Sequence, residues 1–284
     1  MQLIVFHVVS GQSLFTGAVL LLCAAGMSLQ KRRWVSRLVV PATCLGGMLV
    51  LVSSTALPSL LTVLVTIATS AWIGSVWKTR WRQAAVKVMC VSWLLVMLWE
   101  IPYCIAPRAA PVTERGLTLI GDSLSAGTGE QSEGVPWPVL LQQEHKLDVQ
   151  NLAHMGSTTA AALNRVRTEA VAHELVLIEI GGNDLLGSTS ATQFAADLDA
   201  LLAAVTCEGR QVLMFELPLP PLAQRYSFIQ RKLARKHGVQ LIPKRVLLSA
   251  IAGPKATLDG LHLTAAGHTI MADQVWRIIQ PALP

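Results

Sequence analysis

Hydrophobic residues are spread very unevenly along this chain of 284 residues. Four long apolar stretches fill its first part, at about residues 4–28, 38–56, 59–77 and 88–106. Each stretch is close to the ~20 residues that a helix needs to cross the hydrocarbon core of a bilayer. The pattern therefore predicts an all-α transmembrane region of four helices over residues 1–107.

The pattern changes after a linker at residues 108–115. Short apolar runs that are typical of buried strands alternate there with longer segments of helical spacing. The expected strands are at 117–121, 147–153, 175–181, 211–217 and 239–243, and the expected helices are at 158–174, 191–208, 223–237 and from 264 onward. Strand and helix in alternation predict an α/β domain over residues 116–284, with a parallel sheet covered on both faces.

The loops between the apolar stretches predict how the membrane region is oriented. Lys and Arg cluster at residues 31–37 and 78–87, whereas the loop around Pro58 is uncharged. Basic loops stay in the cytoplasm, so the N-terminus and the α/β domain are expected outside it, on the periplasmic side of a bacterial inner membrane. No Lys or Arg precedes Lys31, which argues against a cleaved signal peptide.

Charge and composition narrow the possible partners. Hydrophobic residues make up 52% of the chain and the mean hydropathy is +0.49. Residues 1–113 hold nine Lys or Arg and one acidic residue, Glu100, whereas residues 114–284 hold fourteen basic and sixteen acidic residues. The excess positive charge thus belongs to the membrane region, and a nucleic-acid partner is not expected. Glu100 is interpreted as a partly hydrated group near the outer membrane boundary.

Residues with catalytic chemistry follow the predicted strands, where the carboxyl ends of a parallel sheet form binding sites. Ser123 follows the first strand, Gly156 follows the second, and Asn183 follows the third. Asp259 and His262 stand three residues apart before the last helix. Together these residues supply what acyl transfer needs, namely a nucleophile, a base, a group that orients the base, and donors for an oxyanion.

Each residue has an expected role. Ser123 would attack the carbonyl carbon while His262 takes its proton, and Asp259 would orient the imidazole and stabilise its cation. The backbone N–H groups of Ser123 and Gly156 and the side-chain amide of Asn183 would form the oxyanion hole.

These motifs resemble a known family. Gly-Asp-Ser123-Leu, the lone Gly156, Gly-Gly-Asn183-Asp and Asp259-x-x-His262 are similar, in order, to the four sequence blocks of SGNH (GDSL-type) hydrolases. The extended Gly-Asp-Ser-Leu-Ser-Ala-Gly run is similar to the bacterial periplasmic thioesterase and lysophospholipase subgroup. The resemblance implies a flavodoxin-like three-layer α/β/α fold and hydrolysis of esters or thioesters without a metal or a nucleotide cofactor.

Two features depart from that subgroup, and several side chains have simpler interpretations. Its members are usually soluble secreted enzymes, and a proline is common where this chain continues after His262 with Leu263-Thr264. His268, a rival base, falls within the last helical pattern. His154 is interpreted as a loop residue, and Asp122 and Asp184 as structural hydrogen-bonding groups. The Gly-x-Ser-x-Gly signature of α/β-hydrolases is absent from the sequence.

Three functional hypotheses follow. The first is hydrolysis of an acyl ester of a lipid, such as a lysophospholipid, by an enzyme anchored in the bilayer. The second keeps the chemistry but makes the protein an O-acetyl esterase or acyltransferase that acts on an envelope polysaccharide. The third, of another class, makes the chain a non-catalytic binding module or a subunit of a membrane export complex with a membrane-protein partner.

Overall fold

The chain forms two compact units. The computed structural model describes residues 2–76, 79–127, 134–221, 223–253, 256–257 and 262–284. The helical unit comprises Leu3–Cys104 together with a short segment, Leu219–Gln224. The α/β unit comprises Ile105–Pro218 and Arg225–Pro284. The sequence pattern had not indicated that Leu219–Gln224 belongs with the helices.

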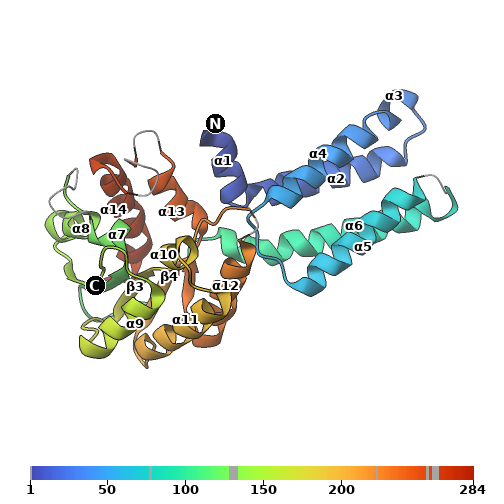
Figure 1. Cartoon of the computed structure of the whole chain (residues 1–284). Coiled ribbons are helices and arrows are strands. Elements are labelled where there is room, and N and C mark those ends of the chain that lie inside the picture. Colours follow the sequence, from blue (N-terminus) through green and yellow to red (C-terminus); the bar gives the residue numbers. More distant parts are fainter. Residues whose placement is uncertain (1, 77–78, 128–133, 222, 254–255, 258–261) are drawn as a thin grey trace. The chain divides into compact units, whose positions relative to one another are not determined.

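The helical unit is built from two helical hairpins. Its elements are α1 (Gln2–Val9), α2 (Gln12–Ser28), α3 (Arg33–Ser36), α4 (Val39–Val52), α5 (Ser59–Ser75), α6 (Thr79–Glu100) and the 3₁₀ helix η1 (Ile101–Cys104). Figure 1 shows α2 beside α4 and α5 beside α6. At Gly17 and Gly46 the backbones of α2 and α4 approach so closely that a Cβ on either glycine would lie less than 3 Å from the other's carbonyl oxygen. Glycine is therefore required on both sides of that contact.

The prediction of four membrane spans is supported only in part. Arg33–Val52 and Arg80–Cys104 are long and apolar enough to cross a membrane. The first predicted stretch, 4–28, is instead two helices bent by 85°. Gly11 has φ = 84° between them, and the Ser10 hydroxyl donates to the carbonyl of His7 and accepts from the N–H of Gln12, which ends α1. The helix Ser59–Ser75 is apolar but only 17 residues long.

Polar groups inside the helical unit are paired across it. The indole of Trp72 donates to the Ser28 hydroxyl, and the indole of Trp93 donates to the hydroxyl of Thr69. Glu100 is buried rather than partly hydrated as expected, with only 2% of its surface exposed. The interpretation of Glu100 as an open interfacial group was therefore wrong for this structure.

The α/β unit contains the predicted parallel sheet. Its strands are β1 (Gly116–Gly121), β2 (Asp148–Asn151), β3 (Leu175–Glu179), β4 (Gln211–Phe215) and β5 (Gln240–Ile242). All pairs are parallel and the order is β2-β1-β3-β4-β5, which is the flavodoxin-like order. β1 and β3 are buried on both faces, because helices cover the sheet on both sides. The predicted α/β class and all five strands are confirmed.

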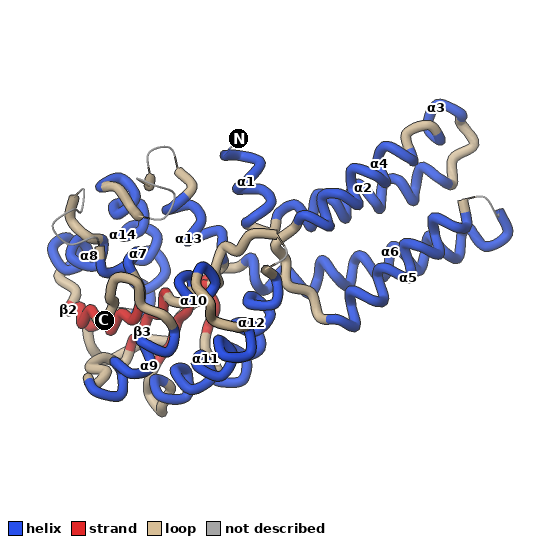
Figure 2. Tube along the Cα trace, viewed as in Figure 1, coloured by secondary structure: helices blue, strands red, loops and turns tan. Residues whose placement is uncertain are grey.

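Helices form a layer on each face of this sheet (Figures 1 and 2). One layer consists of α9 (Thr159–Thr168), α11 (Ala191–Val205) and α12 (Gln224–His237), and the other of α8 (Trp137–His145), α13 (Lys244–Ile251) and α14 (Ala265–Ile279). Three short elements, α7 (Ser123–Ala126), α10 (Gly182–Leu186) and the 3₁₀ helix η3 (Gln280–Ala282), complete the unit. The sequence pattern predicted neither α8 nor α13.

One helix boundary differs from the prediction for a clear reason. The pattern predicted a helix to Glu174, but α9 ends at Thr168. The side chain of Gln150, in β2, donates to the carbonyl of Ala170 and accepts from the N–H of Ala172. These two bonds hold the segment after α9 against β2, and this tertiary contact outweighs its local helical spacing.

Candidate active site

The candidate site lies where the strand order of the sheet reverses. β2 lies on one side of β1 and β3 on the other, so the loops after β1 and β3 diverge there. Gly121, the last residue of β1, pairs in register with Glu179, the last residue of β3. The turn that carries Ser123 and the loop that carries Asn183 therefore start side by side.

The turn that carries Ser123 is tightly held. Ser123 is the first residue of α7, and the Asp122 side chain caps this helix by accepting from the N–H of Leu124 at 3.0 Å. The indole of Trp137 donates to the carbonyl of Leu124 at 3.0 Å. The Ser123 side chain is half-buried. A half-buried serine on a fixed turn is suited to act as a nucleophile.

Asn183 joins two of the predicted site segments. Its amide nitrogen donates to Asp122 Oδ2 at 3.2 Å and to the carbonyl of Ser157 at 3.0 Å. The first bond reaches the Ser123 turn and the second reaches the loop that carries Gly156. An oxyanion at this position would compete with these acceptors for an amide hydrogen of Asn183.

Gly156 lies in the loop after β2, with φ = 71°. This left-handed backbone conformation favours glycine, because a residue with a Cβ atom would be strained in it. The loop is tied down on both sides of Gly156, since the N–H of His154 donates to the carbonyl of Gly121 and the N–H of Ser157 donates to the carbonyl of His154. Gly156 itself is exposed.

Of the predicted Asp-His pair, only His262 can be located. Asp259 lies outside the described residues. His262 is half-buried in the segment before α14. Burial raises the pKa of Asp122, while the N–H of Leu124 and the charge of His262 oppose that rise. This electrostatic effect links His262 to the residue beside Ser123, although, among the described residues, Ser123 and His262 share no hydrogen bond.

A buried carboxylate under the Ser123 turn was missed by the sequence reasoning. Glu179 is 1% exposed, and its Oε2 accepts from the Ser125 hydroxyl at 2.9 Å and from the N–H of Asp122 at 3.4 Å. Burial, and then the neighbouring charge of Asp122, raise the pKa of Glu179 well above its ordinary value. An acidic residue that ends the otherwise apolar run Leu-Val-Leu-Ile-Glu was the available signal.

The neighbouring polar residues have structural contacts. His268 is buried in α14, its Nδ1 accepts from the N–H of Trp137 at 3.3 Å, and burial lowers its pKa. Asp184 accepts from both the N–H and the hydroxyl of Thr159, at 2.8 and 2.9 Å. His154 is an exposed loop residue. The described residues contain no group of three His, Cys, Asp or Glu side chains arranged to hold a metal ion.

Exposed apolar side chains flank the polar site. Met155, beside Gly156, is 54% exposed, and Leu186, in the same helix α10 as Asn183, is 66% exposed. Large apolar groups exposed beside a polar cluster are typical of a surface that receives an apolar ligand.

The fold and the arrangement of these residues define the class of protein, which is a hydrolase of the SGNH type with a flavodoxin-like α/β fold. Its parallel sheet carries Ser123 and Asn183 side by side at the switch point. The model of the GDSL-like Lipase/Acylhydrolase family matches residues 119–270, and the chain belongs to that family. It is a carboxylic ester hydrolase, as its named relatives are.

Relatives share the α/β part of this chain. Esterase TesA of Pseudomonas aeruginosa is 29% identical over 182 residues, which cover 59% of this chain and 89% of TesA. The thioesterase 1/protease 1/lysophospholipase L1 of Escherichia coli K12 is 30% identical over 199 residues, which cover 66% of this chain and 94% of that protein. The crystal structure of TesA superimposes with a TM-score of 0.50 and covers 59% of this chain and 99% of that structure.

Proposed function

We propose that the protein is a membrane-anchored serine esterase that hydrolyses lipid-like acyl esters or thioesters, such as lysophospholipids. The observation that carries this proposal is the contact between the Ser123 turn and Asn183, whose amide donates to Asp122 at 3.2 Å. The exposed Met155 and Leu186 support an apolar acyl group. The relative named lysophospholipase L1 supports the choice of a lipid ester.

The proposed reaction begins with acylation of the serine. Ser123 Oγ forms a bond to the carbonyl carbon and its proton passes to His262. The tetrahedral intermediate then collapses, the bond to the leaving alcohol or thiol breaks, and His262 gives the proton to that group. Asp259 orients the imidazole and stabilises its cation. Water then repeats both steps on the acyl-enzyme and releases the carboxylic acid.

The negative oxygen of each tetrahedral intermediate needs donors that are already in position. We assign this role to the N–H groups of Ser123 and Gly156 and to the amide of Asn183. Asn183 would exchange or share one of its bonds to Asp122 and Ser157 with the oxyanion. Removing one such donor typically costs about 3–4 kcal/mol of transition-state stabilisation.

The helical unit is proposed as the anchor. Among the described residues, two helical stretches are long and apolar enough to cross a bilayer, or three if the bent pair α1–α2 counts as one span. The basic residues near Arg33 and Arg80 support a cytoplasmic location for those loops, with the N-terminus and the α/β unit on the periplasmic side of an inner membrane. Anchoring would keep the enzyme at the surface that contains its substrate.

Labelling with a serine-directed fluorophosphonate tests the chemistry. The full-length protein in nonionic detergent should be labelled, and Ser123→Ala should not, whereas Ser125→Ala keeps Ser123 and should still be labelled. A series of esters from acetyl to long acyl chains tests the substrate. A preference for acetyl esters would contradict the lipid hypothesis and favour the polysaccharide O-acetyl ester hypothesis.

The proposed orientation has its own test. A reporter enzyme that is active only in the periplasm should be active when fused after Arg108 and inactive when fused within the loop at residues 31–37. The opposite pattern would overturn the orientation and leave the chemistry untouched.

A further inference from the structure

The helical unit contains a long uncharged groove between its two hairpins. The groove encloses about 490 Å³ and is lined by α2, α4, α5 and α6 together with Gln224. Although α4 and α5 are joined by a short connection, they do not pack against each other as α2 does on α4 or α5 on α6. No Asp, Glu, Lys, Arg or His lines this groove.

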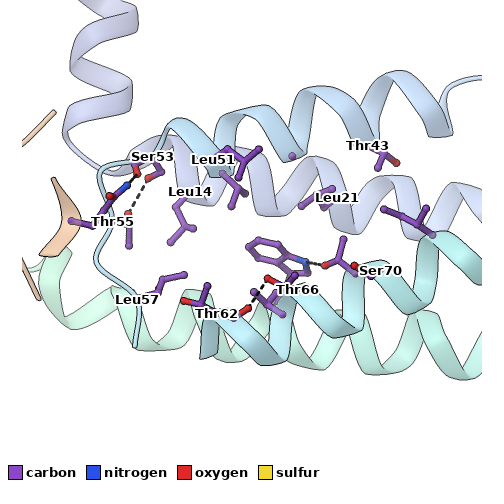
Figure 3. Close-up of a pocket in the computed structure, with 17 residues that line it drawn as sticks. Leu14, Leu21, Thr43, Leu51, Ser53, Thr55, Leu57, Thr62, Thr66 and Ser70 are labelled. Atoms are coloured by element: carbon purple, nitrogen blue, oxygen red, sulfur yellow. Dashed lines mark hydrogen bonds between the residues drawn. The ribbon is translucent and has the colours of Figure 1, made fainter. Parts of the chain in front are cut away.

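The wall of the groove is less polar than its composition suggests. Several threonines line it, but the Thr43 hydroxyl donates to the carbonyl of Val39, that of Thr62 to Pro58, and that of Thr66 to Thr62. Because these hydroxyl hydrogens are used within each helix, the side chains can present their methyl groups to the groove. Figure 3 shows Thr62 and Thr66 on one side of the groove and Leu14 and Leu21 on the other.

One end of the groove is polar. The hydroxyls of Ser53 and Thr55 lie 3.0 Å apart there, and Gln224 donates to the carbonyl of Ser53 at 3.1 Å. Figure 3 shows Ser53 and Thr55 together at this end. A long apolar wall with a single polar end matches a single-chain amphiphile, whose tail is apolar and whose head is polar.

The dimensions of the groove suit a small ligand. From Thr62 to Ile73 the groove follows α5 for about 16 Å at 1.5 Å per residue. Its volume of about 490 Å³ lies within the ordinary range of small-ligand pockets.

We infer that this groove binds the acyl chain of a single-chain lipid, with the polar head at Ser53, Thr55 and Gln224. The inference rests on the proposed function, because the bound lipid would belong to the same class as the substrate or its fatty-acid product.

Photo-crosslinking tests the groove independently of catalysis. Full-length Ser123→Ala protein in diacyl-phospholipid nanodiscs is exposed to a lysophospholipid with a diazirine at the end of its acyl chain. Crosslinks should map to Thr43–Leu51 and Thr62–Ile73, and excess unlabelled lysophospholipid should suppress them. Labelling spread evenly over the outer helix faces, without competition, would overturn the proposal, as would a protein partner crosslinked in place of these segments.

Two glycines give a matched pair of variants. Gly47 lines the groove and Gly74 does not, and a Cβ at either position meets no other atom. Gly47→Leu should reduce the competed crosslinks at least about tenfold, since each displaced methylene weakens binding about fourfold, and Gly74→Leu should leave them unchanged. If Gly47→Leu does not fold, Thr66→Phe tests the same groove, because its ring would fill the groove from the opposite wall. Equal labelling in all three folded variants would refute the site.

The same variants with Ser123 restored separate this inference from the proposed function. Gly47→Leu should lower kcat/KM for long acyl esters, and Gly74→Leu, outside the groove, should leave it unchanged. If the unmodified protein hydrolyses no ester but Gly47-dependent crosslinks persist, the proposed function fails and the lipid site stands. If serine-dependent hydrolysis is normal but the crosslinks do not depend on Gly47, the site fails and the function stands.

Discussion

The most informative single change in the α/β unit is Glu179→Gln. Glu179 is buried beneath the Ser123 turn, and its raised pKa means that the folded protein holds a proton there that the unfolded chain releases. Glutamine has the shape of the protonated acid. Its carbonyl oxygen can still accept from the Ser125 hydroxyl, and its amide can donate to Asp122.

The sign of the expected pH effect follows from that proton. Below the ordinary pKa of 4.5 both folded and unfolded forms of the wild type are protonated at Glu179, so the variant and the wild type should be equally stable. As the pH rises from there towards the raised folded-state pKa, the wild type loses stability, because its folded state binds more protons. The difference in favour of Glu179→Gln should grow by at most about 1.4 kcal/mol per pH unit.

Glu179→Ala provides the contrasting variant. It leaves the Ser125 hydroxyl and the N–H of Asp122 without their acceptor, at about 1–3 kcal/mol for each buried group and so about 2–6 kcal/mol together. A loosened turn would also misplace Ser123, so we expect kcat to fall by about 10- to 100-fold with little change in KM. Glu179→Gln should restore most of that activity.

Urea unfolding of the full-length protein in nonionic detergent, followed by tryptophan fluorescence at pH 5 and pH 8, measures these differences. The buried Trp137 lies in the α/β unit and bonds to the Ser123 turn. If Glu179→Gln is less stable than the wild type by the same amount at both pH values, the prediction that folded Glu179 is protonated is wrong. A wild type that gains stability over this variant as the pH rises would mean that Glu179 is ionised when folded.

Four further changes test neighbouring parts of the unit. Asn183→Ala should lower kcat by about 10²–10³-fold if its amide binds the oxyanion, and steady-state kinetics on a short ester would measure this. His268→Gln should leave the pH profile of kcat/KM unchanged, whereas His262→Gln should abolish activity. The reverse result would mean that His268, and not His262, is the catalytic base. Glu216→Ala should cost about 3–5 kcal/mol in urea unfolding, because it removes the carboxylate that the buried Arg231 binds at 2.7 Å. A loss below 1 kcal/mol would mean that water reaches this pair.

Much of the α/β unit could be predicted because its signals are local. Strands buried on both faces are continuous apolar runs, and residues that follow adjacent parallel strands must meet at one edge. That rule alone predicted the neighbourhood of Ser123 and Asn183. His262 was singled out by the carboxylate three residues before it and by its position ahead of the last helix, since no periodicity relates residue 262 to residue 123.

The missed features depend on contacts between distant residues. The two hydrogen bonds of Gln150 end α9 early, and no propensity of the helix itself predicts them. The bend at Ser10 and Gly11 lies within one apolar stretch, where hydropathy does not change although the helix direction does. The association of Leu219–Gln224 with the helical unit is also non-local, as the hydrogen bond from Gln224 to Ser53 illustrates.

The carboxyl edge of the sheet concentrates buried acids, and each is compensated differently. Asp122 and Asp184 accept hydrogen bonds from backbone and side-chain donors, Glu216 is paired with Arg231, and Glu179, whose pKa is raised by burial, accepts from the Ser125 hydroxyl. Buried acids are costly unless they are satisfied in one of these ways. These four acids interrupt the apolar sequence pattern at the edge of the sheet that carries the site loops. A polar network in which every group is satisfied holds such loops in one arrangement. An acid at the end of an apolar strand is therefore a signal, readable in the sequence, that the following loop has a demanding geometry.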